Sequence, residues 1–210
     1  MFSSLTNKVQ QHTYSYRIPR GSMNIKVVII LLVLPSICLG QNAPDPLYGY
    51  FAEVAGQDGQ ISVNELQRAL TASGIIGSYR VFSRATCAIL ISVLDRDYSG
   101  KMGLNEFQEM WTALNQWKES FARFDSDRSG EIEAHELQSA LSAFGYDLSP
   151  QAQGVIFKRF SEDGNMPFDD YVFCLVKLRA ITDHFRRRDA SQNGYATFKY
   201  DDFIQVTMIY

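Results

Sequence analysis

The 210-residue chain has few cysteines and few histidines, and neither type gathers into a cluster. Its three cysteines, Cys38, Cys87 and Cys174, are widely spaced, and no CxxC pair occurs. The sequence therefore predicts neither a zinc site nor a disulfide framework. Cysteines of this kind usually behave as small apolar residues, so we expect buried free thiols.

The chain also lacks the motifs of common catalytic sites. It has three scattered histidines, His12, His135 and His184, and neither a phosphate-binding glycine loop nor a nucleophile elbow. Its acidic residues are accounted for below as metal ligands or helix caps. We therefore expect a protein that is not an enzyme.

Acidic residues are absent from the first forty positions, where four basic residues lie: Lys8, Arg17, Arg20 and Lys26. Removing these four positive charges from the overall net charge of −3 leaves the rest of the chain at −7. A mildly acidic body argues against a nucleic-acid-binding protein and suits a protein that binds cations.

Residues 23–41 have the layout of a secretory signal peptide that starts at an internal methionine. Lys26 precedes an apolar run over 27–34, a proline ends the run, and small residues follow. The run is shorter than the about 20 residues that a helix needs to cross a bilayer. Three interpretations stay open: a signal peptide, a membrane-attachment segment, or an N-terminal segment foreign to the working protein. We divide the chain into this leader, residues 1–42, and a body, residues 43–210.

A repeat runs through the body. Its loop glycines are Gly100, Gly130, Gly164 and Gly194. Each is followed two residues later by a small or apolar residue, and Gly59 and Ile61 fit the same register further upstream. The flanking segments carry apolar residues at helical spacing. The sequence therefore predicts an all-α, EF-hand-like fold of five consecutive helix–loop–helix units, with short β-bridges between paired loops. We number the loops one to five in chain order.

The second and third loops, residues 95–106 and 125–136, follow the twelve-residue EF-hand calcium loop. Calcium prefers six to eight oxygen ligands at about 2.3–2.6 Å, and alternate residues of such a loop supply them. The predicted ligands of the second loop are Asp95, Asp97, Ser99, the Lys101 carbonyl and Glu106. Those of the third loop are Asp125, Asp127, Ser129, the Glu131 carbonyl and Glu136. The glycine at position six permits the sharp turn around the ion.

Serine at position five, Ser99 in one loop and Ser129 in the other, leaves three carboxylates rather than four beside each ion. We infer affinities in the range of calcium sensors, on the order of 10⁻⁷–10⁻⁵ M. Such sites would be saturated outside the cell. This chemistry therefore favours the cytoplasm over the secretory pathway, which stays the alternative.

The body resembles the penta-EF-hand family of calcium-binding proteins from about Asp45 to Tyr210. The stretches that carry this resemblance are DPLYGYFAEVAGQDGQI, LDRDYSGKMG, FDSDRSGEIE, VKLRAITDHFRRRD and YDDFIQ. The resemblance implies an unusual first loop, residues 55–65, that is one residue short. The ligands that it implies there are the Ala55 carbonyl, Asp58, the Gln60 carbonyl and Glu65. It also implies a flexible N-terminal arm rich in glycine and proline, which the leader replaces in this chain.

The fourth and fifth loops depart from the ligand pattern. Aligned on Gly164, the fourth loop has Arg159 at position one, and a guanidinium repels calcium. The fifth loop begins with Asp189 but has Tyr200 at the position that needs a bidentate acid. We expect neither loop to bind calcium well.

An odd number of units leaves one loop without a partner inside the chain. If units one and two pair, and units three and four pair, residues 195–197 of the fifth loop present an open edge. A two-fold dimer through the fifth unit satisfies both edges at once, and the family resemblance implies the same arrangement. We therefore predict a homodimer, with a monomer that leaves this edge exposed as the alternative.

Together these features predict a calcium sensor. Calcium binding reorients the helices that follow the terminal glutamates, and the segment 107–124 should couple the second loop to the third. Trp111 and Trp117 lie on this segment, either as core residues or as part of a partner surface. The resemblance implies protein partners of the annexin or calcium-channel type. Two other functions stay open: a calcium-binding regulatory subunit of an enzyme, as in calpain, and a secreted calcium-binding structural protein.

A membrane surface is a further expected partner. Two bound calcium ions add four positive charges to the body, which reduces its repulsion from anionic lipid. The basic run 186–188 could contact headgroups or form a solvated helix face. We expect a cytoplasmic protein with calcium-dependent membrane association.

Overall fold

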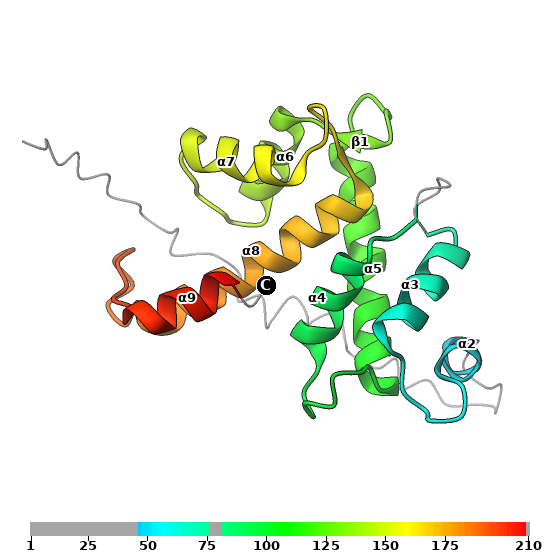
Figure 1. Ribbon diagram of the computed structural model, residues 1–210. Helices are drawn as coiled ribbons and strands as arrows, with labels where there is room; N and C mark the ends of the chain where they lie inside the picture. The colour runs from blue at the N-terminus through cyan, green and yellow to red at the C-terminus, as the bar shows by residue number, and fades with distance from the viewer. Residues whose placement is uncertain (1–45, 76–80, 209–210) are drawn as a thin grey trace, which may run out of the picture.

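The computed structural model describes residues 46–75 and 81–208 (Figure 1). The leader, residues 1–42, and its apolar run therefore lie outside the described residues, as does Cys38. Within the described ranges there are eight helices and two short strands. The helices are α2 (Pro46–Ala55), α3 (Val63–Ala72), α4 (Arg84–Leu94), α5 (Leu104–Phe124), α6 (Ala134–Ala143), α7 (Pro150–Phe160), α8 (Phe168–Arg188) and α9 (Tyr200–Met208). The strands are β1 (Glu131–Ile132) and β2 (Met166–Pro167).

The helices form five consecutive helix–loop–helix units, which confirms the predicted all-α architecture. The units are α2–α3, α4–α5, α5–α6, α7–α8 and α8–α9, so α5 and α8 each serve two units. In Figure 1 these two long helices run through the middle of the molecule. Helices α2, α3 and α4 gather around the first part of α5, and α6 and α7 gather near its end.

The loops pair as the sequence predicts. In the first pair, Ile61 and Met102 form an antiparallel bridge in which each amide donates to the other's carbonyl at 2.8 Å. In the second pair, β1 and β2 are antiparallel with Ile132 opposite Met166. All four of these side chains are fully buried, so each bridge also anchors its loops to the core. Among the described residues of the fifth loop no strand occurs.

The starts of three helices are tied to the loops before them. Glu65, Glu106 and Glu136 each occupy the third position of α3, α5 or α6. From there each accepts a hydrogen bond from the amide that precedes its helix, which is one half of a capping box. The residue that ends each loop therefore also lies in the first turn of the next helix.

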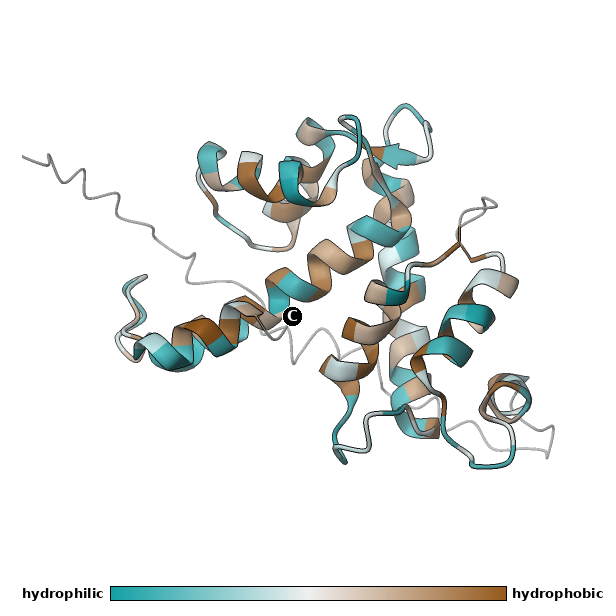
Figure 2. Cartoon of the chain, viewed as in Figure 1, coloured by the Kyte–Doolittle hydropathy of each residue, from teal (hydrophilic) through white to brown (hydrophobic). Residues whose placement is uncertain are grey.

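The core lies between α5, α8 and the helices around them. Phe107, Met110 and Leu114 of α5 are fully buried, as is Tyr171 of α8. The ring of Phe121 packs edge-on against that of Tyr171, with centroids 5.4 Å apart. Figure 2 shows the apolar residues along the helices and mostly polar residues in the connecting loops.

Cys87 and Cys174 are fully buried free thiols, as expected from their spacing. Burial raises the pKa of each thiol to about 12, so both stay protonated and unreactive in the folded protein. Across residues 46–75 and 81–208, no helix is long and apolar enough to cross a bilayer.

Candidate metal centre

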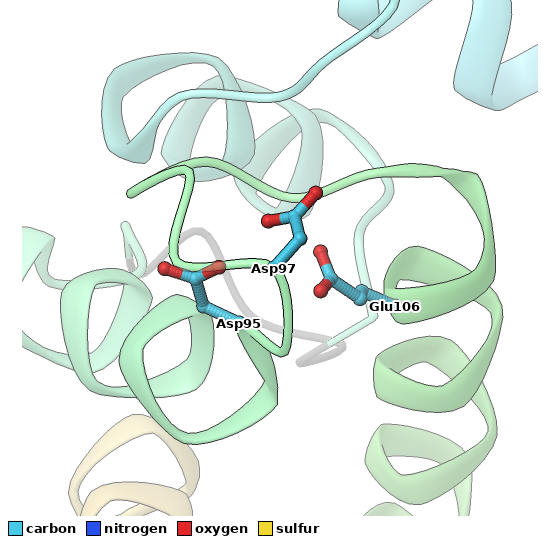
Figure 3. Close-up of side chains that lie close together, drawn as sticks. All are labelled: Asp95, Asp97 and Glu106. Carbon is cyan, nitrogen blue, oxygen red and sulfur yellow. The ribbon is translucent and has the colours of Figure 1, made fainter.

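The second loop gathers three carboxylates at one point. Asp95 and Asp97 come from the loop and Glu106 from the start of α5, and Figure 3 shows them around a common space. One oxygen from each lies within 4.8 Å of one from the others. Oxygens that share one calcium ion at about 2.3–2.6 Å cannot lie more than about 5.2 Å apart. The spacing therefore fits a single calcium ion.

The third loop repeats this arrangement. Asp125, Asp127 and Glu136 offer oxygens within the same 4.8 Å limit. Asp125 and Glu136 are buried, whereas Asp127 faces solvent. Within the described residues, these two loops hold the groups of three or more acidic, histidine or cysteine side chains that could bind a metal ion.

Backbone amides hold the first aspartate of each loop. Asp95 accepts hydrogen bonds from the amides of Ser99 at 3.0 Å and Gly100 at 2.9 Å. Asp125 accepts the equivalent bonds from Ser129 and Gly130, both at 2.9 Å. These amides point inward because the loops turn through left-handed residues. Gly100 and Gly130 have φ values of 71° and 81°, which an L side chain rarely adopts.

The terminal glutamates join the two ends of their loops. Glu106 accepts from the Gly103 amide at 2.9 Å and from the Arg96 amide at 2.8 Å. Glu136 accepts from the Glu133 amide at 3.1 Å and from the Ser126 amide at 2.8 Å. Each glutamate thus connects the end of the incoming helix to the start of the outgoing one. A change in what its oxygens bind is therefore transmitted to both helices.

The serines at position five lie beside the carbonyls at position seven. Ser99 Oγ donates to the Lys101 carbonyl at 3.2 Å, and Ser129 Oγ donates to the Glu131 carbonyl at 2.9 Å. Ser129 Oγ also lies 3.3 Å from Asp125 Oδ1. The hydroxyl and carbonyl oxygens that the sequence predicts as calcium ligands are therefore close to one another. In the third loop the hydroxyl is also close to a carboxylate, that of Asp125.

Hydrogen bonding lowers the pKa of three carboxylates in the second and third loops. The pKa of Asp97 is lowered by hydrogen bonds from the side chain and amide of Ser99. That of Asp127 is lowered by the amide and side chain of Ser129. Burial acts to raise the pKa of Glu136, but its bonds to the Glu133 and Ser126 amides outweigh burial and lower it. The ionised carboxylate is the form that binds a divalent cation.

The first loop shares part of this geometry. Ala55 ends α2, and Asp58 accepts from the Gln60 amide at 3.2 Å. Glu65 accepts from the Ser62 amide at 2.8 Å, as the other terminal glutamates do from the amide before their helices, and it also accepts from the Ser62 hydroxyl at 2.7 Å. The other oxygen of Asp58, however, accepts from Lys101 Nζ at 2.7 Å. The loop therefore has two carboxylates, one of which already has a cationic partner.

The fourth loop is shorter than its alignment on Gly164 predicts. The assignment of Arg159 to position one is wrong, because α7 continues through Arg159 to Phe160. Asp163 and Gly164 both have positive φ, and Glu162 and Asn165 exchange two hydrogen bonds across them. This is a tight two-residue hairpin turn of the kind that joins antiparallel strands. Its backbone does not follow the course of the second and third loops.

The fifth loop has the beginning of a calcium loop without its end. Asp189 accepts from the amides of Asn193 at 3.1 Å and Gly194 at 2.9 Å, as the first aspartates of loops two and three do. Tyr200, at position twelve, is 77% exposed and offers no carboxylate. Asp202 lies in the first turn of α9 and pairs with Arg188 at 3.7 Å.

Two groups near the loops were missed from the sequence. Ser62, which holds Glu65, is the first residue of an S-x-x-E capping box, and that spacing could have found it. The contact of Lys101 with Asp58 joins residues 43 positions apart, and no local pattern could have found it.

Comparison with known proteins agrees with this geometry. The family model described as an EF-hand domain pair matches residues 57–114, and the one described as an EF-hand domain matches residues 116–145. The chain is 59% identical to human sorcin over 164 residues, which cover 78% of this chain and 83% of sorcin. It is 57% identical to human grancalcin over 167 residues, which cover 80% of this chain and 77% of grancalcin.

More distant relatives share the fold. Mouse calpain small subunit 1 is 34% identical over 164 residues, which cover 75% of this chain and 60% of that protein. A solved structure of a homolog of programmed cell death 6 protein from Leishmania major Friedlin matches with a TM-score of 0.62 at 29% identity. That match covers 78% of this chain and 92% of the other.

Proposed function

Since the chain belongs to the penta-EF-hand family and is a calcium-binding sensor rather than an enzyme, we propose which residues bind the ion and how binding is transmitted. The second loop binds calcium through Asp95, Asp97, Ser99, the Lys101 carbonyl and Glu106. The third loop binds it through Asp125, Asp127, Ser129, the Glu131 carbonyl and Glu136. A first site uses the Ala55 carbonyl, Asp58, the Gln60 carbonyl and Glu65.

The observation that carries this proposal is the convergence of three carboxylates in each of two loops, with the third carboxylate on the outgoing helix. Bound calcium supplies positive charge that these carboxylates share. The chain's own part is to transmit the change: Glu106 and Glu136 lie in the first turns of α5 and α6, and each is held by an amide at the far side of its loop. Because α5 ends at Phe124, next to Asp125, the two sites share one rigid helix.

Two tryptophans on α5 would report such a change. The ring of Trp111 packs edge-on against Tyr50 of α2, with centroids 5.7 Å apart. Trp117 lines a cavity of about 60 Å³ between α4, α5 and α8. Both are half-buried, so movement of α5 against its neighbours alters their surroundings. A partner surface that opens here would include this cavity.

Tryptophan fluorescence tests this proposal. We expect the emission of the full chain to change between chelator and micromolar calcium, and the change to be lost when Glu106→Gln and Glu136→Gln are combined. Glu119→Gln is the control for the loss of a single carboxylate, because it removes one negative charge from an exposed position on α5 outside any loop. A wild-type spectrum that is the same with and without calcium would contradict the proposed transmission through α5.

We also propose that the fifth unit joins two copies of the chain. Its loop residues 195–197 pair with no strand in the described structure. Large apolar side chains of this unit are exposed, among them Tyr195, Phe203 and Met208 at 59%, 50% and 77%. A two-fold contact would cover them and pair the two open edges.

Sedimentation measures this association. The wild-type chain should sediment as a dimer at micromolar concentration, and Phe203→Asp should convert it to a monomer. Val155→Asp is the control, because Val155 is 66% exposed on α7, outside the fifth unit. A monomeric wild-type chain would contradict the homodimer, and co-purification with a protease chain would instead favour the regulatory-subunit alternative.

Calcium-dependent partners of the annexin or channel type, and a cytoplasmic location with membrane association, complete the proposal. A cavity of about 450 Å³ between α8 and the α6–α7 connection, lined by Tyr146, Leu148 and Phe185 among others, offers an apolar surface for a partner segment. The guanidinium of Arg188 stacks on the Phe198 ring, 4.9 Å from its centroid. Contact with lipid headgroups would therefore be made by Arg186 and Arg187. Co-sedimentation with anionic vesicles, with and without calcium, tests the membrane part.

A further inference from the structure

Lys101 belongs to two calcium loops at once. Its carbonyl stands at position seven of the second loop, where it accepts a hydrogen bond from Ser99 Oγ at 3.2 Å. Its side chain leaves that loop and donates from Nζ to Asp58 Oδ2 of the first loop at 2.7 Å. One residue therefore offers a ligand oxygen to one site and a positive charge to the other.

The bridge between the loops brings this contact about. Ile61 and Met102 exchange two hydrogen bonds of 2.8 Å, which fixes Lys101 beside the first loop. The side chain of Lys101 is 40% exposed and that of Asp58 is 53% exposed, so the ammonium reaches the carboxylate across the surface of the paired loops. The third loop has Glu131, of opposite charge, at the same position.

The ammonium stands in the field of both first-loop carboxylates. Its hydrogen bond is the largest cause that lowers the pKa of Asp58 and raises the pKa of Lys101. The charge of Glu65 raises the pKa of Lys101 further. The first loop has only these two carboxylates to offer a divalent ion, whereas the second and third loops each bring together three.

We propose that Lys101 is a tethered competitor of calcium in the first loop. This inference rests on the proposed function, in which loop 55–65 is a calcium site. The Asp58 oxygen that receives the ammonium must release it, at least in part, to bind the ion, and the fixed positive charge repels the ion as it enters. The first loop therefore fills at a higher calcium concentration than the second and third loops. Lys101 sets the size of this difference in concentration. Because exposed ion pairs are weak, the expected effect is about two- to five-fold in affinity.

Titration calorimetry with CaCl₂ tests this on the full chain. A background variant that combines Glu106→Gln with Glu136→Gln removes the terminal ligands of the second and third loops and leaves the first. Adding Lys101→Met to this background should lower the Kd for calcium about two- to five-fold. Lys101→Arg, which keeps the charge, should stay close to the background. The amide signals of Gly56 and Gly59 in NMR spectra provide an independent measure of first-loop filling.

Two controls assign the effect to the contact. Lys118→Met removes the same charge from an exposed site on α5, about 20 Å along the helix from its start, and should leave the Kd unchanged. In a chain that also carries Glu65→Ala, Lys101→Met should have no effect. Circular dichroism of each variant checks that it is folded.

The outcomes separate this inference from the proposed function. If Lys101→Met leaves the Kd of the background unchanged or raises it, Lys101 does not compete with calcium. If the background binds no calcium below the millimolar range, the first loop is not a site and the inference fails. In that case calcium binding by the second and third loops, measured in the wild-type chain, still stands.

Discussion

Glu136 is buried and accepts three hydrogen bonds that link the two ends of the third loop. Their donors are the amides of Glu133 and Ser126, at 3.1 and 2.8 Å, and the Ser126 hydroxyl at 2.7 Å. We predict that Glu136→Ala destabilises the calcium-free protein as well as removing a calcium ligand. The substitution leaves both amides without their acceptor at the boundary of the core.

Two opposing effects set the size of this loss. Removing Glu136 relieves its burial and its repulsion from Asp127, but these are outweighed by the hydrogen bonds, because the pKa of Glu136 is lowered overall. Hydrogen bonds to a charged group contribute about 1.5–3 kcal/mol each. In a loop, water can bond to the amides that lose their acceptor, and this recovers part of the lost stability. We therefore expect a loss of about 2–3 kcal/mol. For a chain of this length that corresponds to a fall in Tm of about 4–12 °C.

The assay is thermal unfolding followed by circular dichroism in excess chelator. Glu136→Gln keeps one acceptor oxygen, so it should fall only about 2–4 °C below the wild type. Glu119→Gln should have the same Tm as the wild type, since Glu119 is exposed. Equal Tm values for Glu136→Ala and the wild type in chelator would refute the structural role assigned to this side chain.

Three further predictions concern the fold. Leu114 is fully buried on α5, so Leu114→Ala should lower the free energy of unfolding by about 2–5 kcal/mol in urea titrations, and a loss below about 1 kcal/mol would show that this part of the core is loosely packed. Cys87 and Cys174, whose pKa values burial raises to about 12, should resist a thiol reagent at pH 8 until the protein unfolds; rapid labelling of the folded chain at either position would contradict their burial. Burial also raises the pKa of Asp169, against its hydrogen bonds with Thr86 and Ser83. The folded state therefore holds this proton more tightly than the unfolded state, and the resulting stability is complete below the ordinary value of 3.8 and is lost as pH rises through the folded pKa. Asp169→Asn should remove this part of the pH dependence of unfolding, and identical pH profiles for the variant and the wild type would contradict it.

The second and third loops could be predicted from the sequence because their geometry is local. A turn at Gly100 or Gly130 brings residues within twelve positions around one point, so spacing alone identifies the carboxylates that meet there. The pairing of the loops could also be predicted, because the apolar residues at the equivalent position of loops one to four all need burial. These residues are Ile61, Met102, Ile132 and Met166.

The fourth loop shows where spacing fails. Counting back from Gly164 assumes a loop of standard length, but α7 continues through Arg159 and the hairpin at Asp163 shortens the turn. Whether a helix runs two residues further depends on packing against its neighbours, which one sequence does not reveal. The contact between Lys101 and Asp58 is hidden for a similar reason, because it exists only once the two loops are paired.

Titration of the 210-residue chain with calcium, followed by calorimetry, tests the proposed second and third sites most directly. We predict that two sites fill with Kd values on the order of 10⁻⁷–10⁻⁵ M, and that combining Glu106→Gln with Glu136→Gln removes both. No heat of binding below millimolar calcium would contradict the assignment of these loops and leave only the helical architecture.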